Sequence, residues 1–326
     1  MHFAYPPRKS STPPPFRPRS GQLPTLRRGR LRTIAVGLLA CILVLYLIFK
    51  PSKQSPYHER QPAGTPAVVL VTVLDTKQYS AGYLKTVREN REEYASRHDS
   101  YHSHQTSNSH RETGYKTIIT EANQYDTAGA PTTWTKLMAT RHALAKYPDC
   151  KFVWYLDQDA YIMNPTQSLE DLVLQSKQLE SLMIRGQPVV PPDSIIKTYG
   201  HLRGEHIDVI LSQDKSGLVH NSIIIRNGEW AKFFLETWLD PLYRTYNFQK
   251  AERHALEHIV QWHPTVLSKL ALVPQRTFAS YSKPTLGEQY QEGDFVVMLA
   301  GCSNIGPESC EVESGRFWEK WKASFG

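Results

Sequence analysis

Acidic residues are absent from the first 53 positions, although the whole chain of 326 residues contains 31 of them. The same segment carries ten lysines and arginines, which leaves 28 basic against 31 acidic residues in the remainder. The formal net charge of +7 therefore belongs to the N-terminal segment, and the remainder carries about −3. Because a nucleic-acid-binding domain has its positive patch on the folded part, this distribution argues against nucleic acid as a partner.

Long apolar runs are scarce as well, and one of them, residues 33–49, continues for 17 residues without a charge. As a helix it would extend about 25 Å, which is enough to cross a thin bilayer. The sequence after it offers no small-x-small cleavage site, so the run indicates an uncleaved anchor and not a signal peptide. Eight basic residues precede it and two follow closely. The positive-inside rule therefore predicts a cytoplasmic N-terminus and a luminal C-terminal domain, the type II orientation.

Proline is distributed unevenly, and this completes the predicted domain organisation. Seven of the 22 prolines lie within the first 24 residues, so residues 1–32 are expected to be a disordered basic cytoplasmic tail. Residues 33–49 are the predicted membrane anchor, and the proline-punctuated residues 50–66 are expected to be a stem. Residues 67–326 then form a luminal domain that is long enough to bury a large core.

Cysteine is rare, with four residues in the chain. Cys41 lies within the predicted anchor, which leaves Cys150, Cys302 and Cys310 in an oxidising lumen where disulfides persist. One of these three stays unpaired or pairs elsewhere. Cys302 and Cys310 are the closest in sequence, but spacing does not establish their pairing. A usable N-glycosylation site is also absent, because the single match, residues 164–166, has proline in its middle position.

Two apolar runs rich in β-branched or aromatic residues predict buried strands at residues 67–75 and 151–156. Helices are predicted at residues 81–94 and 133–146. The first helix has apolar or aromatic positions on one side: Tyr83, Leu84, Val87 and Tyr94. Strands and helices that alternate in this order imply an α/β domain with a mainly parallel sheet, flanked by helices, which binds ligands at the carboxyl ends of its strands.

Residues 100–113 are polar and contain three histidines, His102, His104 and His110. Histidines so close together are one pattern of a metal site. No apolar residues frame them, so a solvated loop is the favoured interpretation.

Asp157 and Asp159 follow the second predicted strand directly and form an Asp-x-Asp motif. In extended backbone, side chains two residues apart project to the same face, so both carboxylates can converge on one ion. Carboxylate oxygens suit a hard cation such as Mn²⁺ or Mg²⁺, which also binds diphosphate oxygens. The motif is short enough to occur by chance, but its place at a buried strand end predicts a metal and nucleotide-sugar site.

The string FVWYLDQDAYIMNP at residues 152–165 resembles the signature of glycosyltransferase family 34. More narrowly, it resembles the fungal alpha-1,6-mannosyltransferase subunits of mannan polymerase complexes. Further segments match in the family's order: residues 89–99, 134–136, 218–230, 238–243, 254–264, 272–276 and 292–302. The resemblance covers roughly residues 67–310.

This resemblance implies a GT-A-like fold, GDP-mannose as the donor, Mn²⁺ as the metal and retention of the anomeric configuration. It also implies work on N-glycan outer chains at the Golgi membrane, together with other mannosyltransferase subunits. The wider family includes galactosyl- and xylosyltransferases. Asp157 and Asp159 are then the metal ligands, and Trp134 and Lys136 join them in binding the donor.

Glu252 is the expected catalytic residue, because the family places an acidic residue just before its Ala-Leu helix. The competing interpretation is a carboxylate that stabilises the start of a helix running to Trp262.

Three departures from the family pattern support an alternative function. Met298 stands where the family commonly has a metal-binding histidine, Ser303 where plant relatives have a basic residue, and Arg253 where the family has glutamine. A non-catalytic subunit of a mannosyltransferase complex is therefore one alternative. The other is a zinc peptidase, because His254, Glu257 and His258 fit the His-x-x-Glu-His pattern.

Overall fold

The computed structural model describes most of the chain from Thr65 onward and one short segment before it: residues 36–39, 65–99, 112–191, 194–246, 248–299, 302 and 309–325. Two compact units are present, Met1–His58 and Glu59–Gly326. Residues 36–39 of the first unit are helical and exposed. No helix in the described segments combines the length and apolar character that a membrane crossing requires. The predicted anchor, residues 33–49, lies outside the described residues except for 36–39.

The second unit is built on a six-stranded sheet. Its strands, in spatial order, are β4 (Lys116–Glu121), β2 (Val68–Leu74), β5 (Phe152–Leu156), β8 (Gly217–Arg226), β7 (Val209–Asp214) and β9 (Leu270–Val273). Strand β8 runs antiparallel to both of its neighbours, and the other three pairings are parallel. The predicted mainly parallel sheet is therefore confirmed, with one reversed strand near its centre.

The direction of β8 decides which residues meet at one edge of the sheet. Leu156, at the end of β5, pairs with Ser222 in the middle of β8. Strands β2, β4, β5, β7 and β9 all end at this edge, and β8 begins there. Side chains just before Ser222 therefore lie beside side chains just after Leu156.

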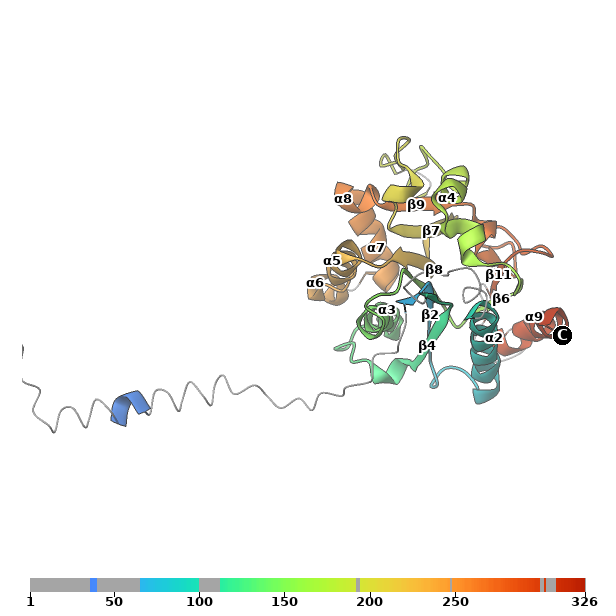
Figure 1. Ribbon diagram of the computed structural model, residues 1–326, viewed down its shortest axis with the longest axis horizontal. Helices are drawn as coiled ribbons and strands as arrows, with labels where there is room; N and C mark the ends of the chain where they lie inside the picture. The colour runs from blue at the N-terminus through green and yellow to red at the C-terminus, as the bar shows by residue number, and fades with distance from the viewer. Residues whose placement is uncertain are drawn as a thin grey trace, which may run out of the picture. The chain divides into compact units, whose positions relative to one another are not determined.

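The sheet is buried on both faces, as the continuous apolar strands predicted. Alternate residues of β2 enter different cores: Val69 and Val71 face one, and Val68 and Leu70 face the other. Both cores are closed by helices, and Figure 1 shows helices on both sides of the sheet. Because the sheet is covered on both faces, β2 and β5 have continuous apolar sequences and not an alternating pattern of apolar and polar residues.

The first face is covered by a group of helices and a preceding 3-10 turn. They are η3 (Thr132–Trp134), α3 (Thr135–Lys146), α5 (Glu229–Trp238), α6 (Pro241–Thr245), α7 (Ala251–Trp262) and α8 (Pro264–Leu267). The helix predicted at 133–146 is α3, and its first two residues belong to η3. Trp238 donates from Nε1 to the carbonyl oxygen of Glu252 at 2.8 Å, which ties α5 to the first turn of α7.

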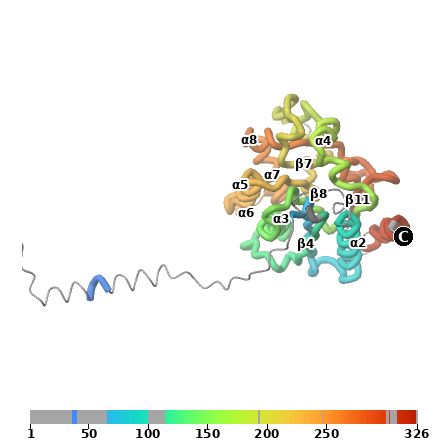
Figure 2. The backbone as a smooth tube through the Cα atoms, viewed as in Figure 1, coloured from blue at the N-terminus to red at the C-terminus, as the bar shows by residue number. Residues whose placement is uncertain are grey.

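The second face is covered by α2 (Ala81–Asp99), the π-helical turn η4 (Glu170–Leu174), α4 (Ser176–Leu182) and a small sheet. The small sheet contains β10 (Ser280–Tyr281), β11 (Val296–Met298) and β6 (Ala160–Ile162), in that order. The C-terminal helix α9 (Cys310–Phe325) packs beside α2 through a third apolar cluster that includes Val87 and Trp321 (Figure 2).

Shorter elements complete the described unit: β1 (Thr65–Pro66), β3 (Glu112–Thr113), η2 (Ala122–Gln124), η5 (Gly204–His206) and η6 (Gln275–Thr277). Strand β3 pairs with β1, so the end of the predicted polar loop 100–113 is a short strand. The three histidines of that loop lie outside the described residues.

Helix α2 contains the four residues predicted to share its buried side, and all are buried. It continues five residues beyond the predicted end, because Ala95 and His98 also pack inward. Cys302 and Cys310 form a disulfide, whereas Cys150 is free and buried. Burial, with the nearby charge of Asp149, raises the pKa of the Cys150 thiol to about 12, so this thiol stays protonated.

Candidate active site

A cleft of about 710 Å³ opens at the sheet edge where β5 ends and β8 begins. It takes side chains from β2, η3, α3, β8 and the start of α7 together with the loops that follow β2 and β5. The residues that carry its chemistry are Asp75, Tyr79, Thr133, Lys136, Asp157, Asp159, His220, Asn221 and Glu252. Four of the five predicted site residues therefore line one cleft, and the fifth, Trp134, does not.

The backbone of the Asp-x-Asp motif is fixed from two sides. The amide of Asp157 donates to the carbonyl oxygen of Asn221 at 2.8 Å, which continues the β5–β8 pairing by one residue. The buried guanidinium of Arg91 donates to the carbonyl oxygens of Asp157 and Ala160, both at 2.8 Å. Oε1 of Gln158 accepts a hydrogen bond from the backbone amide of Asp75 at 2.8 Å. The motif is therefore held rigidly between the ends of β2, β5 and β8.

Asp159 is half-buried and lies against two tyrosines of the α2 region. The hydroxyl of Tyr79 donates to its Oδ2 at 3.1 Å, and that of Tyr83 lies 3.4 Å from its Oδ1. Burial and the nearby charge of Asp157 raise the pKa of Asp159 to about 7. Two carboxylates that repel one another in a cleft are an arrangement that a bound cation would stabilise.

The side chains of the cleft supply some, but not all, of the ligands that a hard divalent cation requires. Asp157 and Asp159 offer carboxylate oxygens, which Mn²⁺ and Mg²⁺ accept. Among the described residues, no group of three or more His, Cys, Asp or Glu side chains is arranged to hold a metal ion. The two carboxylates would therefore share such an ion with oxygens of a bound diphosphate or with water.

Lys136 occupies the centre of the cleft's inner wall. Its Nζ lies 3.5 Å from Oδ2 of Asp157, 2.9 Å from Oδ1 of Asn221 and 3.0 Å from Oε1 of Glu252. Burial alone would lower the pKa of this ammonium, but the charges of Glu252 and Asp157 outweigh burial and raise it. Lys136 is thus a permanent positive charge in a position suited to a negatively charged ligand.

Both oxygens of Glu252 are bound by side chains from other elements. Oε1 accepts from Lys136 and, at 2.8 Å, from Nε2 of His220, while Oε2 accepts from Thr133 at 2.5 Å. Burial would raise the pKa of this carboxyl, but Lys136 and His220 lower it well below its usual range. The described hydrogen bonds include none from an α7 amide to this side chain. Glu252 lies in the first turn of α7, and its side-chain contacts among the described residues are with Thr133, Lys136 and His220.

His220 and Asn221 are site residues that belong to none of the recognised sequence motifs. They precede Ser222 on β8, inside the segment 218–230 that carried part of the family resemblance. Burial and the charge of Lys136 lower the pKa of His220, so its ring is neutral and its Nε2–H donates to Glu252. The signal in the sequence was a polar pair interrupting an otherwise apolar strand.

The backbone beside Glu252 is strained. Ala251, the first residue of α7, has a φ of 43°, in the left-handed region that residues with a side chain rarely adopt. Such conformations persist where the surrounding structure enforces them, and they concentrate at functional sites. Here the strained residue directly precedes Glu252 and lines the cleft itself.

Of the other residues that the sequence singled out, Trp134 and Met298 lie outside the cleft and Arg253 lies at its rim. Trp134 is buried in the core below it, and Met298 is buried in β11 opposite Ala160. Arg253 reaches the rim and forms ion pairs with Asp214 at 2.6 Å and Glu257 at 3.2 Å. Ser303 lies outside the described residues.

The His-x-x-Glu-His pattern does not form a peptidase site. Oε1 of Glu257 accepts from the amide of Leu218 and from Arg253, and Nδ1 of His258 bonds the hydroxyl of Tyr243. Nε2 of His254 lies 4.0 Å from Oε2 of Glu257. A carboxylate engaged in this way cannot act as the base that the pattern requires.

Comparisons with known proteins agree with the geometry of the cleft. The model of a family described as the galactosyl transferase GMA12/MNN10 family matches residues 64–309. An uncharacterized alpha-1,2-galactosyltransferase of Schizosaccharomyces pombe is 29% identical over 91% of this chain and 92% of its own length. The probable alpha-1,6-mannosyltransferase MNN11 of Saccharomyces cerevisiae is 27% identical over 81% of this chain and 64% of its own.

A third relative, an alpha-1,2-galactosyltransferase of Schizosaccharomyces pombe, is 28% identical over 68% of this chain and 56% of its own length. Among solved structures, a glycosyltransferase involved in the glycosylation of the major capsid of PBCV-1 superimposes with a TM-score of 0.50. That similarity covers 79% of this chain and all of the other at 12% identity, so it concerns the fold alone.

Proposed function

Because this chain belongs to the galactosyl transferase GMA12/MNN10 family, we propose that it transfers a hexose from a nucleoside diphosphate sugar to a glycan acceptor. It is a glycosyltransferase of family 34. The observation that carries the proposal is the cleft itself, in which Asp157, Asp159 and the permanently charged Lys136 converge at a strand end. Paired carboxylates and one cation suit a metal-bound diphosphate.

GDP-mannose is the donor that we propose, in line with the resemblance to the alpha-1,6-mannosyltransferases. MNN10 and MNN11 of Saccharomyces cerevisiae are named probable alpha-1,6-mannosyltransferases. Other relatives are named alpha-1,2-galactosyltransferases, which makes a nucleoside diphosphate galactose the second candidate. The two donors differ in the orientation of hydroxyls on the sugar ring as well as in the base that each carries.

Mn²⁺ is the proposed metal, held by Asp157 and Asp159. When bound, it would neutralise negative charge on the departing nucleoside diphosphate. Lys136 contributes fixed positive charge on the same side of the cleft. Met298 is buried and its thioether is a poor ligand for a hard ion, so the diphosphate is expected to complete the coordination.

Glu252 is the residue that we propose for stabilising the positive charge that develops at the anomeric carbon. In a retaining transfer, the bond from this carbon to the diphosphate oxygen breaks. A bond to an acceptor hydroxyl oxygen forms on the same face, and the hydroxyl proton passes to the departing diphosphate. Because Thr133, Lys136 and His220 hold the carboxylate, its position is set before the substrates bind.

The wider context of this activity is proposed from the sequence. We propose that the catalytic domain lies in the lumen behind a type II anchor, which the charge asymmetry around residues 33–49 supports, and that the membrane is that of the Golgi, in line with the family resemblance. Two relatives carry the names of alpha-1,6-mannosyltransferases, and we propose that other mannosyltransferase subunits are partners of this chain.

A non-catalytic subunit is the competing function, supported by the burial of Met298 and the engagement of Arg253 in an ion-pair cluster. Donor turnover by the purified full chain separates the two. We expect Mn²⁺-dependent hydrolysis of GDP-mannose, and transfer when a mannose oligosaccharide is added. Turnover of a nucleoside diphosphate galactose instead would change the donor assignment. Absence of turnover with both donors would favour the non-catalytic role.

A further inference from the structure

A second, smaller pocket of about 380 Å³ adjoins the cleft. The two hollows share three residues, Pro131, Phe248 and Ala251, so they are neighbours along one continuous surface. One wall of the small pocket is the turn from Thr127 to Ala130, whose small side chains leave it open. The opposite wall comes from α6, which contributes Tyr243 and Arg244.

An aromatic stripe continues outward from this pocket along α7. His254, His258 and Trp262 are spaced by four residues and therefore share one side of the helix. The ring of His258 lies 6.1 Å from Trp262 and 5.7 Å from Tyr243, measured between centroids. Phe248, which lines both hollows, lies 6.1 Å from Tyr243. We call these five rings the aromatic stripe.

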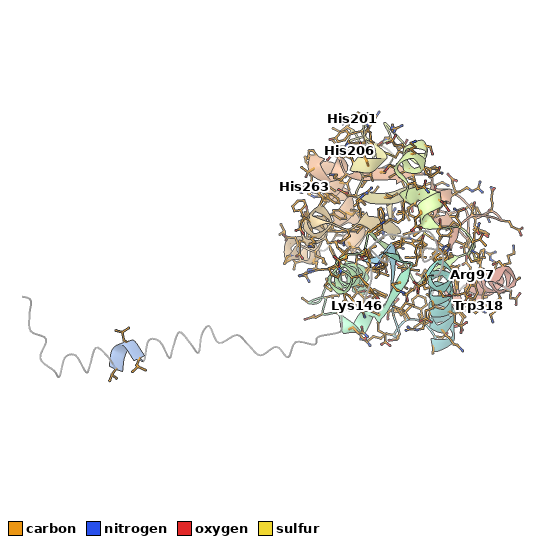
Figure 3. The ribbon with its side chains drawn as sticks, in the orientation of Figure 1. Arg97, Lys146, His201, His206, His263 and Trp318 are labelled. Carbon is orange, nitrogen blue, oxygen red and sulfur yellow. A yellow bond between two sulfur atoms is a disulfide. The ribbon has the colours of Figure 1, made fainter. Side chains whose placement is uncertain are left out.

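Much of this surface is exposed, although its side chains are apolar or aromatic. Trp262 is 71% exposed, and Tyr246, whose ring lies 4.7 Å from that of Phe248, is 68% exposed. His263 follows Trp262, and Figure 3 shows it at the outer margin of the helical layer. The stripe therefore runs from the cleft to the edge of the domain. Exposed aromatic rings in a row indicate a binding surface.

Polar side chains also line the pocket and its margin. Nε of Arg244 is buried and has no hydrogen-bond partner among the described residues. Arg244 as a whole is half-buried and lines the pocket, and a guanidinium carries several N–H donors that suit the acceptor oxygens of a ligand. The hydroxyl of Tyr243 and the imidazole of His258 lie at the margin of the same surface.

A sugar ring matches this combination of groups. Its two faces carry C–H groups that pack on aromatic rings, and its rim carries hydroxyls that accept and donate hydrogen bonds. A chain of sugars presents these features repeatedly, as the stripe presents its rings. A protein partner would be expected to need a wider apolar patch, whereas this surface is narrow and ends inside an enzyme cleft.

We propose that the small pocket and the aromatic stripe bind the acceptor as an oligosaccharide, with its reacting end in the pocket and its following sugars along α7. This inference rests on the proposed function, since it gives the acceptor a place beside the cleft that holds the donor. Ala251 and Phe248 then separate the two substrates at the point where Glu252 enters the cleft.

The test uses full-length protein in detergent and mannose oligosaccharides of one, two and four sugars. Trp262→Ala is the principal variant. Because the side chain of Trp262 is mostly exposed, its removal should leave the fold intact. Phe233→Ala is the matched control, since Phe233 is a half-exposed aromatic residue on α5 outside the stripe. Acceptor KM is measured by transfer, and binding of each oligosaccharide is measured by NMR saturation transfer without donor.

We expect Trp262→Ala to raise the KM for the four-sugar acceptor about ten-fold, which corresponds to the loss of one stacked sugar. The KM for the single sugar, the kcat and donor hydrolysis should stay as in the parent, and the control should change nothing. Tyr243→Phe should weaken binding of every acceptor length, because the pocket serves the reacting sugar.

KM values that stay at the parent's level for all three acceptor lengths in Trp262→Ala would overturn the proposal. So would saturation transfer that Trp262→Ala and Tyr243→Phe leave unchanged, because the sugars would then bind elsewhere. If Trp262→Ala releases a partner protein from the full chain but keeps its KM values, the stripe is a protein interface and the proposal fails. The binding measurement needs no turnover, so it decides even if donor hydrolysis is absent and the proposed function falls.

Discussion

Nζ of Lys136 lies 3.0 Å from Oε1 of Glu252, and both side chains are almost fully buried behind the wall of the cleft. This pair joins α3 to α7 across the edge of the sheet. Lys136 also lies 3.5 Å from Asp157, so one ammonium connects the expected metal-binding side of the cleft with its expected catalytic side. A change at either end of this connection should affect both stability and activity.

Breaking the pair should destabilise the protein strongly. Lys136→Met leaves the Glu252 carboxylate buried without its main counter-charge, which costs about 3–5 kcal/mol of unfolding free energy. Adding Glu252→Gln to Lys136→Met should restore part of that loss, because the uncompensated charge is then gone. Urea unfolding of the four proteins in this cycle measures the coupling. Strict additivity of the two single changes would show that the pair contributes nothing.

Removing the charge of Glu252 should impair turnover more than binding. Glu252→Gln retains a carbonyl oxygen for Lys136 and an outline close to that of glutamate, so donor affinity should change little. The kcat for transfer should fall by about 10²–10³, the size of effect seen when one stabilising group is removed from an active site. Glu236→Gln, an exposed residue on α5, is the control. Normal turnover in Glu252→Gln, with a lowered melting temperature, would restrict Glu252 to a structural role.

The carboxylate pair should be required for metal-dependent donor binding but not for folding. Asp157→Asn and Asp159→Asn should each abolish the Mn²⁺-dependent part of GDP-mannose binding, measured by calorimetry with and without the metal. The melting temperature of Asp159→Asn should stay near or above that of the parent, since the parent carboxylate is held beside Asp157 with a raised pKa. Unchanged metal-dependent binding in both variants would place the ion elsewhere.

Glu252 should contribute to stability at neutral pH and lose that contribution in acid. Its pKa in the folded protein lies well below the ordinary value of 4.5, so the unfolded chain takes up the proton first as the pH falls. The contribution is complete above pH 4.5 and declines as the pH drops toward the folded pKa. The difference in unfolding free energy between the parent and Glu252→Gln should therefore start to shrink as the pH falls below about 5, and it should continue to shrink at pH 3. A constant difference over this range would contradict the lowered pKa.

The topology of the chain can be tested in sealed microsomes. Protease added outside should remove the basic residues 1–32 and spare the domain from residue 67 onward, as the charge asymmetry predicts. Detergent should make the domain accessible and serves as the control. Digestion of the domain in intact vesicles would show that it faces the cytoplasm and that the predicted orientation is wrong.

Much of the fold was predictable because its signals are local. The apolar run of β5 and the two aspartates after it lie within eight residues, so strand, burial and motif are read together. The sides of α2 and α7 follow from helical periodicity. The end of α2 was not predictable, because Ala95 and His98 are buried by contacts that arrive from distant parts of the chain.

The candidate site was predictable in its motif but not in its network. The motif itself marked Asp157 and Asp159, and the family resemblance marked Lys136 and Glu252. Neither of them marked Thr133, His220 or Asn221, or the disulfide between Cys302 and Cys310. The sequence also did not show which residues near Trp134 reach the cleft. Thr133 and Thr135 line it, whereas Trp134 is buried in the core.

The sequence by itself determined the order of strands and helices, the charge asymmetry of the N-terminus and the carboxylate motif, because each depends on residues close together in the chain. The tertiary structure alone decided that β8 runs antiparallel beside β5, and this places His220 and Asn221 next to Asp157. It also decided that Glu252 is bound by Lys136 from 116 positions earlier in the chain. Such contacts depend on how strands are ordered across the sheet, and strand order is fixed by the packing of both cores and not by any local pattern.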